Sequence, residues 1–223
     1  MNKLKKFWRN NRGFVLFIGL MLVFRSAVAD WNDVPSGSMQ PTIEIGDRIL
    51  VNKMAYDLRV PFSTVSLLKL ADPKRGDIVI FASEAADNRL VKRVVGVPGD
   101  VVAMQQNVLT INGKTLAYTE VDEPTEAMAT NSSSEILLTE QLGSVAHPVK
   151  LAPLSSALAN FVPVQVPAGH YLVLGDNRDN SADSRVIGFV PRHEIIGRAG
   201  KVLFSLDYDN YYLPRSERFL AAL

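Results

Sequence analysis

The sequence predicts a mostly β protein of antiparallel sheets, preceded by one N-terminal helix. Short runs rich in β-branched residues recur after residue 30, and Gly, Pro or Asp bounds each run. Two of these runs flank Asn112-Gly113, a pair typical of a hairpin turn because both turn residues take positive φ. Strands do not alternate with helical segments and no Gly-rich phosphate loop is present, which argues against a nucleotide-binding α/β fold.

The first predicted element is a basic, apolar leader that ends near Ala29. Its run Phe14–Phe24 holds 11 apolar residues without interruption. Trp8 and Trp31 bracket this run 23 residues apart, which is about 35 Å along a helix. That length matches the ~30 Å hydrocarbon layer of a bilayer with its interfaces. We therefore expect a single-pass transmembrane anchor over residues 13–29.

A cleavable signal peptide is the alternative interpretation of this leader. Ala27-Val28-Ala29 fits a small-x-small cleavage site, although Arg25 lies between the apolar run and that site. We expect the leader to be retained, with self-cleavage at this site as the alternative. Residues 1–12 would then stay in the cytoplasm and the body would lie on the outer side of the membrane.

The net charge of +1, from 24 basic and 23 acidic residues, hides an uneven distribution. Residues 1–29 carry six cations and no acid, so residues 30–223 hold 18 basic and 23 acidic residues and carry −5. An acidic body argues against a nucleic-acid partner, which needs clustered positive charge. The absence of Cys excludes disulfides, thiolate metal sites and a cysteine nucleophile.

The body divides into a β core and an insertion. The core comprises residues 30–104 and 168–223, and the inserted β-rich extension comprises residues 105–167. Within the extension we expect one hairpin, a polar loop at 121–134 and a short helix at 135–143. The predicted strands of the whole body lie at 48–53, 77–82, 90–97, 101–104, 108–111, 114–118, 171–174 and 202–204.

Histidine and acidic clusters do not point to a triad or a metal site. His147, His170 and His193 lack a distinctive local context or metal-ligand spacing, so we expect no cofactor and no metal. The polar stretch 175–185 does not match a calcium-binding EF-hand loop. With Asp179 as the first position, the sixth is Ser184 where the loop needs Gly, and the twelfth is Val190 where it needs Glu. A turn held by Asx hydrogen bonds explains its composition, but not a stretch of eleven residues so densely polar between two apolar segments.

Two hydroxyl groups lie just after the leader, in the segment 35–42. Ser36 and Ser38 flank Gly37, whose flexible backbone lets amides point freely. This pattern suits a serine nucleophile beside an oxyanion hole. A plain polar turn is the simpler alternative.

Lys92 is the candidate base for such a serine. In the predicted strand 90–97, Leu90, Lys92 and Val94 share one face, and burial among apolar neighbours lowers a lysine pKa toward neutrality. Arg93 faces the other way, where we expect it to reach water. An edge-strand charge that discourages aggregation is the alternative for Lys92.

Five short motifs follow one another along the chain, at 36–42 (SGSMQPT), 46–51 (GDRILV), 76–79 (GDIV), 92–100 (KRVVGVPGD) and 175–185 (GDNRDNSADSR). In this order they resemble the motifs of the type I signal peptidases, membrane-anchored proteases with a Ser/Lys dyad. The resemblance implies a mostly β, signal-peptidase-like catalytic core with an apolar surface facing the membrane, and it weakens only across the extension.

The resemblance implies a role for each matching residue. Ser38 would be the nucleophile and Lys92 the general base. The Ser38 N–H and the Ser36 hydroxyl would form the oxyanion hole. Ser181 would orient the Lys92 amine, and the ion pair of Asp183 with Arg185 would support the site.

It also implies the substrate and the partners. Secretory precursors with small residues at −1 and −3 would bind as extended strands against an exposed strand edge. The lipid bilayer would be the second partner: the resemblance implies the bacterial inner membrane, with the catalytic body on its outer, periplasmic side. Val34, Met39, Leu90 and Val91 flank the catalytic residues and are our candidates for the pocket lining.

Three alternatives remain beside this interpretation. Conjugation-linked peptidases of the same clan are equally short, so a specialised role is one of them. A self-cleaving Ser/Lys repressor is disfavoured, because that class needs a DNA-binding domain and no anchor. The third is a non-catalytic, membrane-tethered β module.

Overall fold

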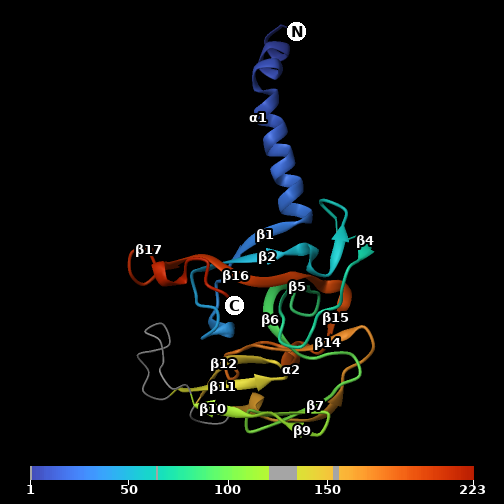
Figure 1. Ribbon diagram of the computed structural model, residues 1–223, viewed down its shortest axis with the longest axis vertical. Helices are drawn as coiled ribbons and strands as arrows, with labels where there is room; N and C mark the ends of the chain where they lie inside the picture. The colour runs from blue at the N-terminus through green and yellow to red at the C-terminus, as the bar shows by residue number, and fades with distance from the viewer. Residues whose placement is uncertain (1, 64, 121–134, 153–155) are drawn as a thin grey trace.

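The computed structural model describes residues 2–63, 65–120, 135–152 and 156–223. Helix α1 (Asn2–Ala27) projects away from the body, and the strands gather in sheets below it (Figure 1). The polar loop expected at 121–134 lies outside the described residues.

The expectation of a transmembrane anchor over residues 13–29 is not met. Within the described part of the chain, no helix is both long enough and apolar enough to cross a membrane. The physical reason lies in the composition of α1: its uninterrupted apolar run is the 11 residues Phe14–Phe24, which extend only about 17 Å along a helix. Arg12 and Arg25 flank that run.

The end of α1 also differs from the expected geometry. The helix stops at Ala27, and the chain enters strand β1 (Ala29–Asp33), so Trp31 lies on a sheet and not on the helix. Arg25 folds back: its guanidinium lies 3.9 Å from the centre of the Trp31 ring and pairs with Asp30 at 2.7 Å. Both interactions hold the helix end against the body.

The largest sheet has eight strands and carries the core. Its order is β1-β2-β16-β5-β6-β14-β15, with β17 paired to β16. Its strands after β1 are β2 (Asp47–Asn52), β5 (Ile78–Ser83), β6 (Asn88–Gly96), β14 (His170–Leu174), β15 (Val190–Pro191), β16 (Ile195–Asp207) and β17 (Leu213–Pro214). Every pairing between neighbouring strands of this sheet is antiparallel.

Three smaller sheets complete the body. They are β13-β7-β8-β9, β10-β11-β12 and β3-β4. Their strands are β3 (Asp57–Arg59), β4 (Ser66–Lys69), β7 (Val101–Gln105), β8 (Val108–Ile111), β9 (Lys114–Thr115), β10 (Tyr118–Glu120), β11 (Ile136–Leu142), β12 (Val145–Leu151) and β13 (Phe161–Gln165). The short helices are η1 (Gly37–Met39), η2 (Lys53–Ala55), η4 (Ala157–Ala159), α2 (Ser184–Ile187), η5 (Arg192–Glu194) and η6 (Ser216–Arg218).

These sheets agree with most of the sequence-based predictions. Each predicted strand overlaps an observed one, and Asn112 and Gly113 take φ of 52° and 76°, as the hairpin turn requires. The helix expected at 135–143 is wrong. That segment forms β11, which pairs with β12 from Ile136 to Leu142 because a two-residue turn lets the chain fold back on itself.

The core places the two chemistry-bearing segments next to one another. Val34, Met39 and Ile43, from the segment after β1, pack in one buried cluster with Ile78 and Ile80 of β5. Strand β6 lies between β5 and β14 in the sheet. The serine segment therefore packs on the sheet that carries Lys92.

Candidate active site

Ser38 and Lys92 meet at the surface of the main sheet. Ser38 lies in η1, and Lys92 lies 54 residues later in β6. The Lys92 Nζ donates to Ser38 Oγ at 2.7 Å and to the Val91 carbonyl at 3.0 Å. The two side chains that the sequence analysis singled out are thus in direct contact.

Lys92 is 2% exposed, which excludes a solvated edge-strand charge. Burial lowers its pKa from 10.5 to about 8, although the charges of Asp183 and Asp176 act in the opposite direction. Val94 and Leu90, its neighbours on the same face, belong to one apolar cluster. An amine in this setting loses its proton near neutral pH, as a general base must.

The supporting residues only partly follow the expectation. Asp183 is fully buried and pairs with Arg185 at 2.6 Å, as expected, and it also accepts from the Gly175 N–H at 3.0 Å. The hydrogen bond expected between Ser181 and the Lys92 amine is not observed. The Ser181 Oγ is buried and has no hydrogen-bond partner among the described residues, because it faces the Gly175 backbone.

A groove runs from this dyad along β6. The cavity of about 270 Å³ lies between the segment that follows β1 and the Asn88–Lys92 part of β6. It contains all four candidate pocket residues and both serines. The lining residues are Asn32, Asp33, Val34, Pro35, Ser36, Ser38, Met39, Asn88, Arg89, Leu90, Val91 and Lys92.

Two strand edges border this groove. Strand β14 pairs with β6 only from Arg93 to Gly96, so residues 88–92 of β6 have no strand partner on that side within the described chain. Strand β1 ends the main sheet and pairs with β2 alone. Free edges of this kind accept an extended peptide as an added strand.

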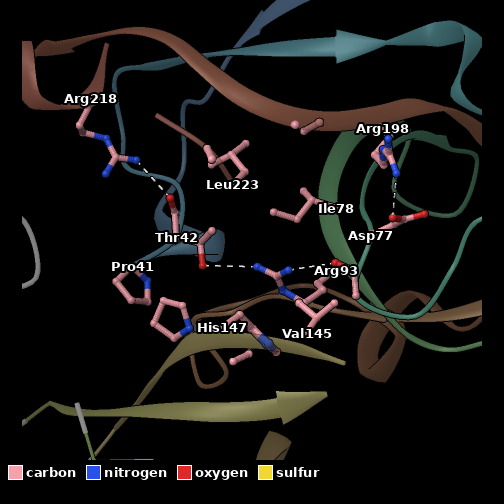
Figure 2. Close-up of a pocket in the computed structure, with 16 residues that line it drawn as sticks. Pro41, Thr42, Asp77, Ile78, Arg93, Val145, His147, Arg198, Arg218 and Leu223 are labelled. Carbon is pink, nitrogen blue, oxygen red and sulfur yellow. Dashed lines mark hydrogen bonds and ion pairs between the residues drawn. The ribbon is translucent and has the colours of Figure 1, made fainter. Parts of the chain in front are cut away.

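Arg93 contradicts the expectation that it reaches water. It is 3% exposed and forms a two-pronged ion pair with buried Asp176, at 2.8 and 2.7 Å. The reason is tertiary: strand β12 of the extension covers that face. Figure 2 shows Thr42, Val145 and His147 around Arg93. All four residues line a second cavity of about 570 Å³.

Asp176, Thr42 and His147 lie around Arg93, and the sequence analysis assigned no role to them. Asp176 accepts from the Thr42 hydroxyl at 2.6 Å as well as from Arg93, and these contacts hold its pKa low despite complete burial. His147 is also buried, and burial lowers its pKa to about 4, so the ring is neutral at pH 7. Asp176 lies within the dense polar motif 175–185, and this motif was the sequence feature that could have indicated its importance.

One surface cluster has ligand types that metals accept. Glu84, His193 and Glu194 bring one ligand atom each within 4.8 Å of one another. Exposed acidic groups often gather without a metal, and the cluster contains no residue of the Ser38–Lys92 site.

The family model and the sequence relatives show one family. The family model described as "Signal peptidase, peptidase S26" matches residues 8–204. A signal peptidase I of Pseudomonas aeruginosa is 38% identical over 203 residues, which cover 86% of this chain and 69% of that protein. A signal peptidase I of Pseudomonas fluorescens is 39% identical with the same coverage. A crystal structure of a signal peptidase I from Enterococcus faecalis V583 is 30% identical and covers 58% of this chain and 98% of that one, with a TM-score of 0.37.

Proposed function

This chain belongs to the signal peptidase family of S26 peptidases, and on that premise we propose that it removes signal peptides from secretory precursors with a Ser38–Lys92 dyad. The observation that carries the proposal is the 2.7 Å contact between Lys92 Nζ and Ser38 Oγ, made by a lysine that is 2% exposed. A serine hydroxyl needs an adjacent base to act as a nucleophile, and Lys92 is the base within reach.

The first step is attack on the scissile carbonyl. When Lys92 is neutral, the contact reverses its direction, and the Ser38 hydroxyl donates to Nζ. Ser38 Oγ then bonds to the carbonyl carbon while its proton passes to Nζ. The resulting ammonium returns that proton to the leaving amine, which frees the mature protein and leaves an acyl-enzyme. Water, activated by the same amine, releases the signal peptide.

The oxyanion hole is assigned to the Ser38 N–H and the Ser36 hydroxyl. Ser38 lies in the first turn of η1, where backbone N–H groups have no acceptor within the helix. Ser36 precedes that turn and lines the same cavity as Ser38. Two donors at this point would stabilise the charge that develops on the carbonyl oxygen.

Substrate selection is assigned to the groove beside β6. An extended precursor segment would pair with the free edge of β6, and its alternate side chains would enter the space among Val34, Met39, Leu90 and Val91. A cavity of about 270 Å³ shared by several side chains favours small residues such as Ala at −1 and −3.

We place this activity at the outer surface of the bacterial plasma membrane. The β3–β4 hairpin beside the end of α1 exposes Phe62, Leu67 and Leu68, and the Phe62 N–H donates to Ser26 Oγ of α1 at 2.6 Å. An exposed apolar patch of this kind suits a lipid surface. Flotation with anionic and neutral vesicles tests this: the variant Leu67→Glu/Leu68→Glu should float less than wild type, and equal flotation would contradict the placement.

The direct test of the function is cleavage of a precursor peptide. The wild type should cut a peptide after its Ala-x-Ala site, and Ser38→Ala should not. Ser63→Ala is the matched control, because Ser63 lies in the exposed β3–β4 turn and takes no part in the site. Cleavage by Ser38→Ala at the wild-type rate would refute the proposed nucleophile.

A further inference from the structure

Glu140 is a buried carboxylate in the extension that the proposed chemistry does not use. It lies in β11 and is fully buried. Arg178 donates to both of its oxygens at 2.8 Å, and the Tyr118 hydroxyl donates to it at 2.5 Å. The charge of Arg178 holds the pKa of Glu140 low despite the burial, so the carboxylate is charged at neutral pH. Such a pair is costly to bury and fixes two segments in one geometry.

Arg178 belongs to the loop that supports the serine. Its Nε donates to the Gly175 carbonyl at 3.1 Å, which closes the loop 175–178 on itself. The next residue back, Asn177, donates from its backbone N–H to the Ser38 carbonyl at 3.1 Å. Its side-chain amide donates to the Gly37 carbonyl at 3.0 Å. Asn177 of the loop therefore binds two successive backbone carbonyls of η1.

The loop has no room to shift toward the serine. A Cβ atom on Gly175 would overlap Ser181 Oγ and the Ser38 carbonyl oxygen, so the backbone there is in close contact with the nucleophile segment. On the other side, β12 holds the loop through two backbone hydrogen bonds of 2.9 Å, from Lys150 N–H to the Asp176 carbonyl and from Arg178 N–H to the Lys150 carbonyl. Strand β12 of the extension thus holds the backbone of the loop 175–178 in place.

We propose that Glu140 is a positioning residue for the Ser38–Lys92 pair. Through Arg178 it pins the loop 175–178, and the loop sets where the Ser38 backbone lies relative to Lys92. This inference rests on the proposed function. It gives the extension a role in catalysis, since β11 supplies the carboxylate from 38 residues before Arg178.

The test compares two variants of the same strand. Glu140→Gln keeps the shape of the side chain and removes its charge. Leu142→Ala is the control: Leu142 is two residues farther along β11 and 1% exposed, so its truncation also weakens the extension without touching Arg178. Peptide cleavage is measured at temperatures where circular dichroism shows both variants folded.

We expect Glu140→Gln to lower kcat roughly 10- to 100-fold, because small misplacements of a reacting group cost that much. KM should change little, since Glu140 is not among the residues of the groove, and Leu142→Ala should keep the wild-type kcat. A Glu140→Gln variant with wild-type kcat would overturn the proposal. So would an equal loss of kcat in both variants.

A double variant covers the case in which Glu140→Gln does not fold. Glu140→Leu/Arg178→Met replaces the ion pair by apolar groups, a change that buried pairs often tolerate. It should fold and still show a reduced kcat with an unchanged KM, and full kcat would overturn the proposal. The proposed function itself fails on a different result, which is an inactive wild type or an active Ser38→Ala.

Discussion

Lys92 Nζ lies 2.7 Å from Ser38 Oγ, and the lysine reaches it from a strand whose neighbouring apolar residues keep water away. Two elements distant in sequence supply the pair, so its geometry depends on how η1 packs on the main sheet. The proposed chemistry needs both this contact and the burial of Lys92. The contact lets the proton of the Ser38 hydroxyl pass to Nζ, and the burial lowers the pKa of the amine so that it is a base near neutral pH.

The pH dependence of cleavage should follow the Lys92 pKa of about 8. A lysine is a base only when neutral, so kcat/KM should rise with pH and level off above about 8. Initial rates with an Ala-x-Ala peptide between pH 5 and 10 measure this. A rate that is flat from pH 6 to 10 would contradict a lysine base.

Stability should respond to the same group. Because burial lowers the folded-state pKa from 10.5 to about 8, the unfolded chain binds more protons between these two values. The free energy of unfolding should therefore rise with pH across that window. Below pH 8 the buried ammonium should destabilise the folded chain to its full extent. Lys92→Met should raise the free energy of unfolding at pH 7 by about 3 kcal/mol. Urea unfolding at pH 7 and 10.5 tests this, and a destabilised Lys92→Met at pH 7 would contradict it.

Replacing Asp183 should change the pKa of Lys92. The charges of Asp183 and Asp176 raise the Lys92 pKa and that of Arg185 lowers it, so Asp183→Asn removes one of the two carboxylates and leaves the opposing cation in place. We expect the rise of kcat/KM to move to lower pH, with a lower maximal rate because the Gly175 N–H loses a charged acceptor. The pH profile of this variant measures both effects. A shift to higher pH would show that another charge controls Lys92.

The groove should reject large side chains at −1 until it is widened. Leu90→Ala removes a half-buried side chain from the cavity that also holds Ser38. We expect its kcat/KM for a peptide with Val or Leu at −1 to rise relative to Ala, by roughly tenfold for a pocket difference of this size. Leu68→Ala, far along the chain and exposed, is the control. If Leu90→Ala left the ratio of kcat/KM for Val or Leu at −1 to that for Ala unchanged, Leu90 would not line the pocket for the −1 residue.

The burial of Lys92 among apolar residues could be predicted because its signal is local. A period of two within one strand places Leu90, Lys92 and Val94 on one face. Leu90 and Val94 do pack in one apolar cluster, while Val91 packs against another. The positions of Ser38 and of the Asp183–Arg185 pair followed from the resemblance, and the observed contacts agree with both.

The errors have tertiary causes. Arg93 was expected to reach water, but the extension covers it and Asp176 neutralises it. The segment 135–143 has no strong strand or helix signal of its own, and its pairing with β12 decides its structure. Trp31 was expected at the end of a long helix, yet pairing of β1 with β2 takes it onto a sheet. Glu140 escaped notice because its partner Arg178 lies 38 residues away.

The most direct test of the Ser38–Lys92 dyad is the single-turnover cleavage rate of Lys92→Ala at pH 9, measured beside Lys53→Ala. Lys53 is another partly buried lysine of the body, but its amine binds the Arg25 carbonyl at the end of α1. We predict that Lys92→Ala, still folded by circular dichroism, loses at least about 1,000-fold in rate, while Lys53→Ala cleaves like the wild type. A folded Lys92→Ala that cleaves within tenfold of the wild-type rate would contradict the account.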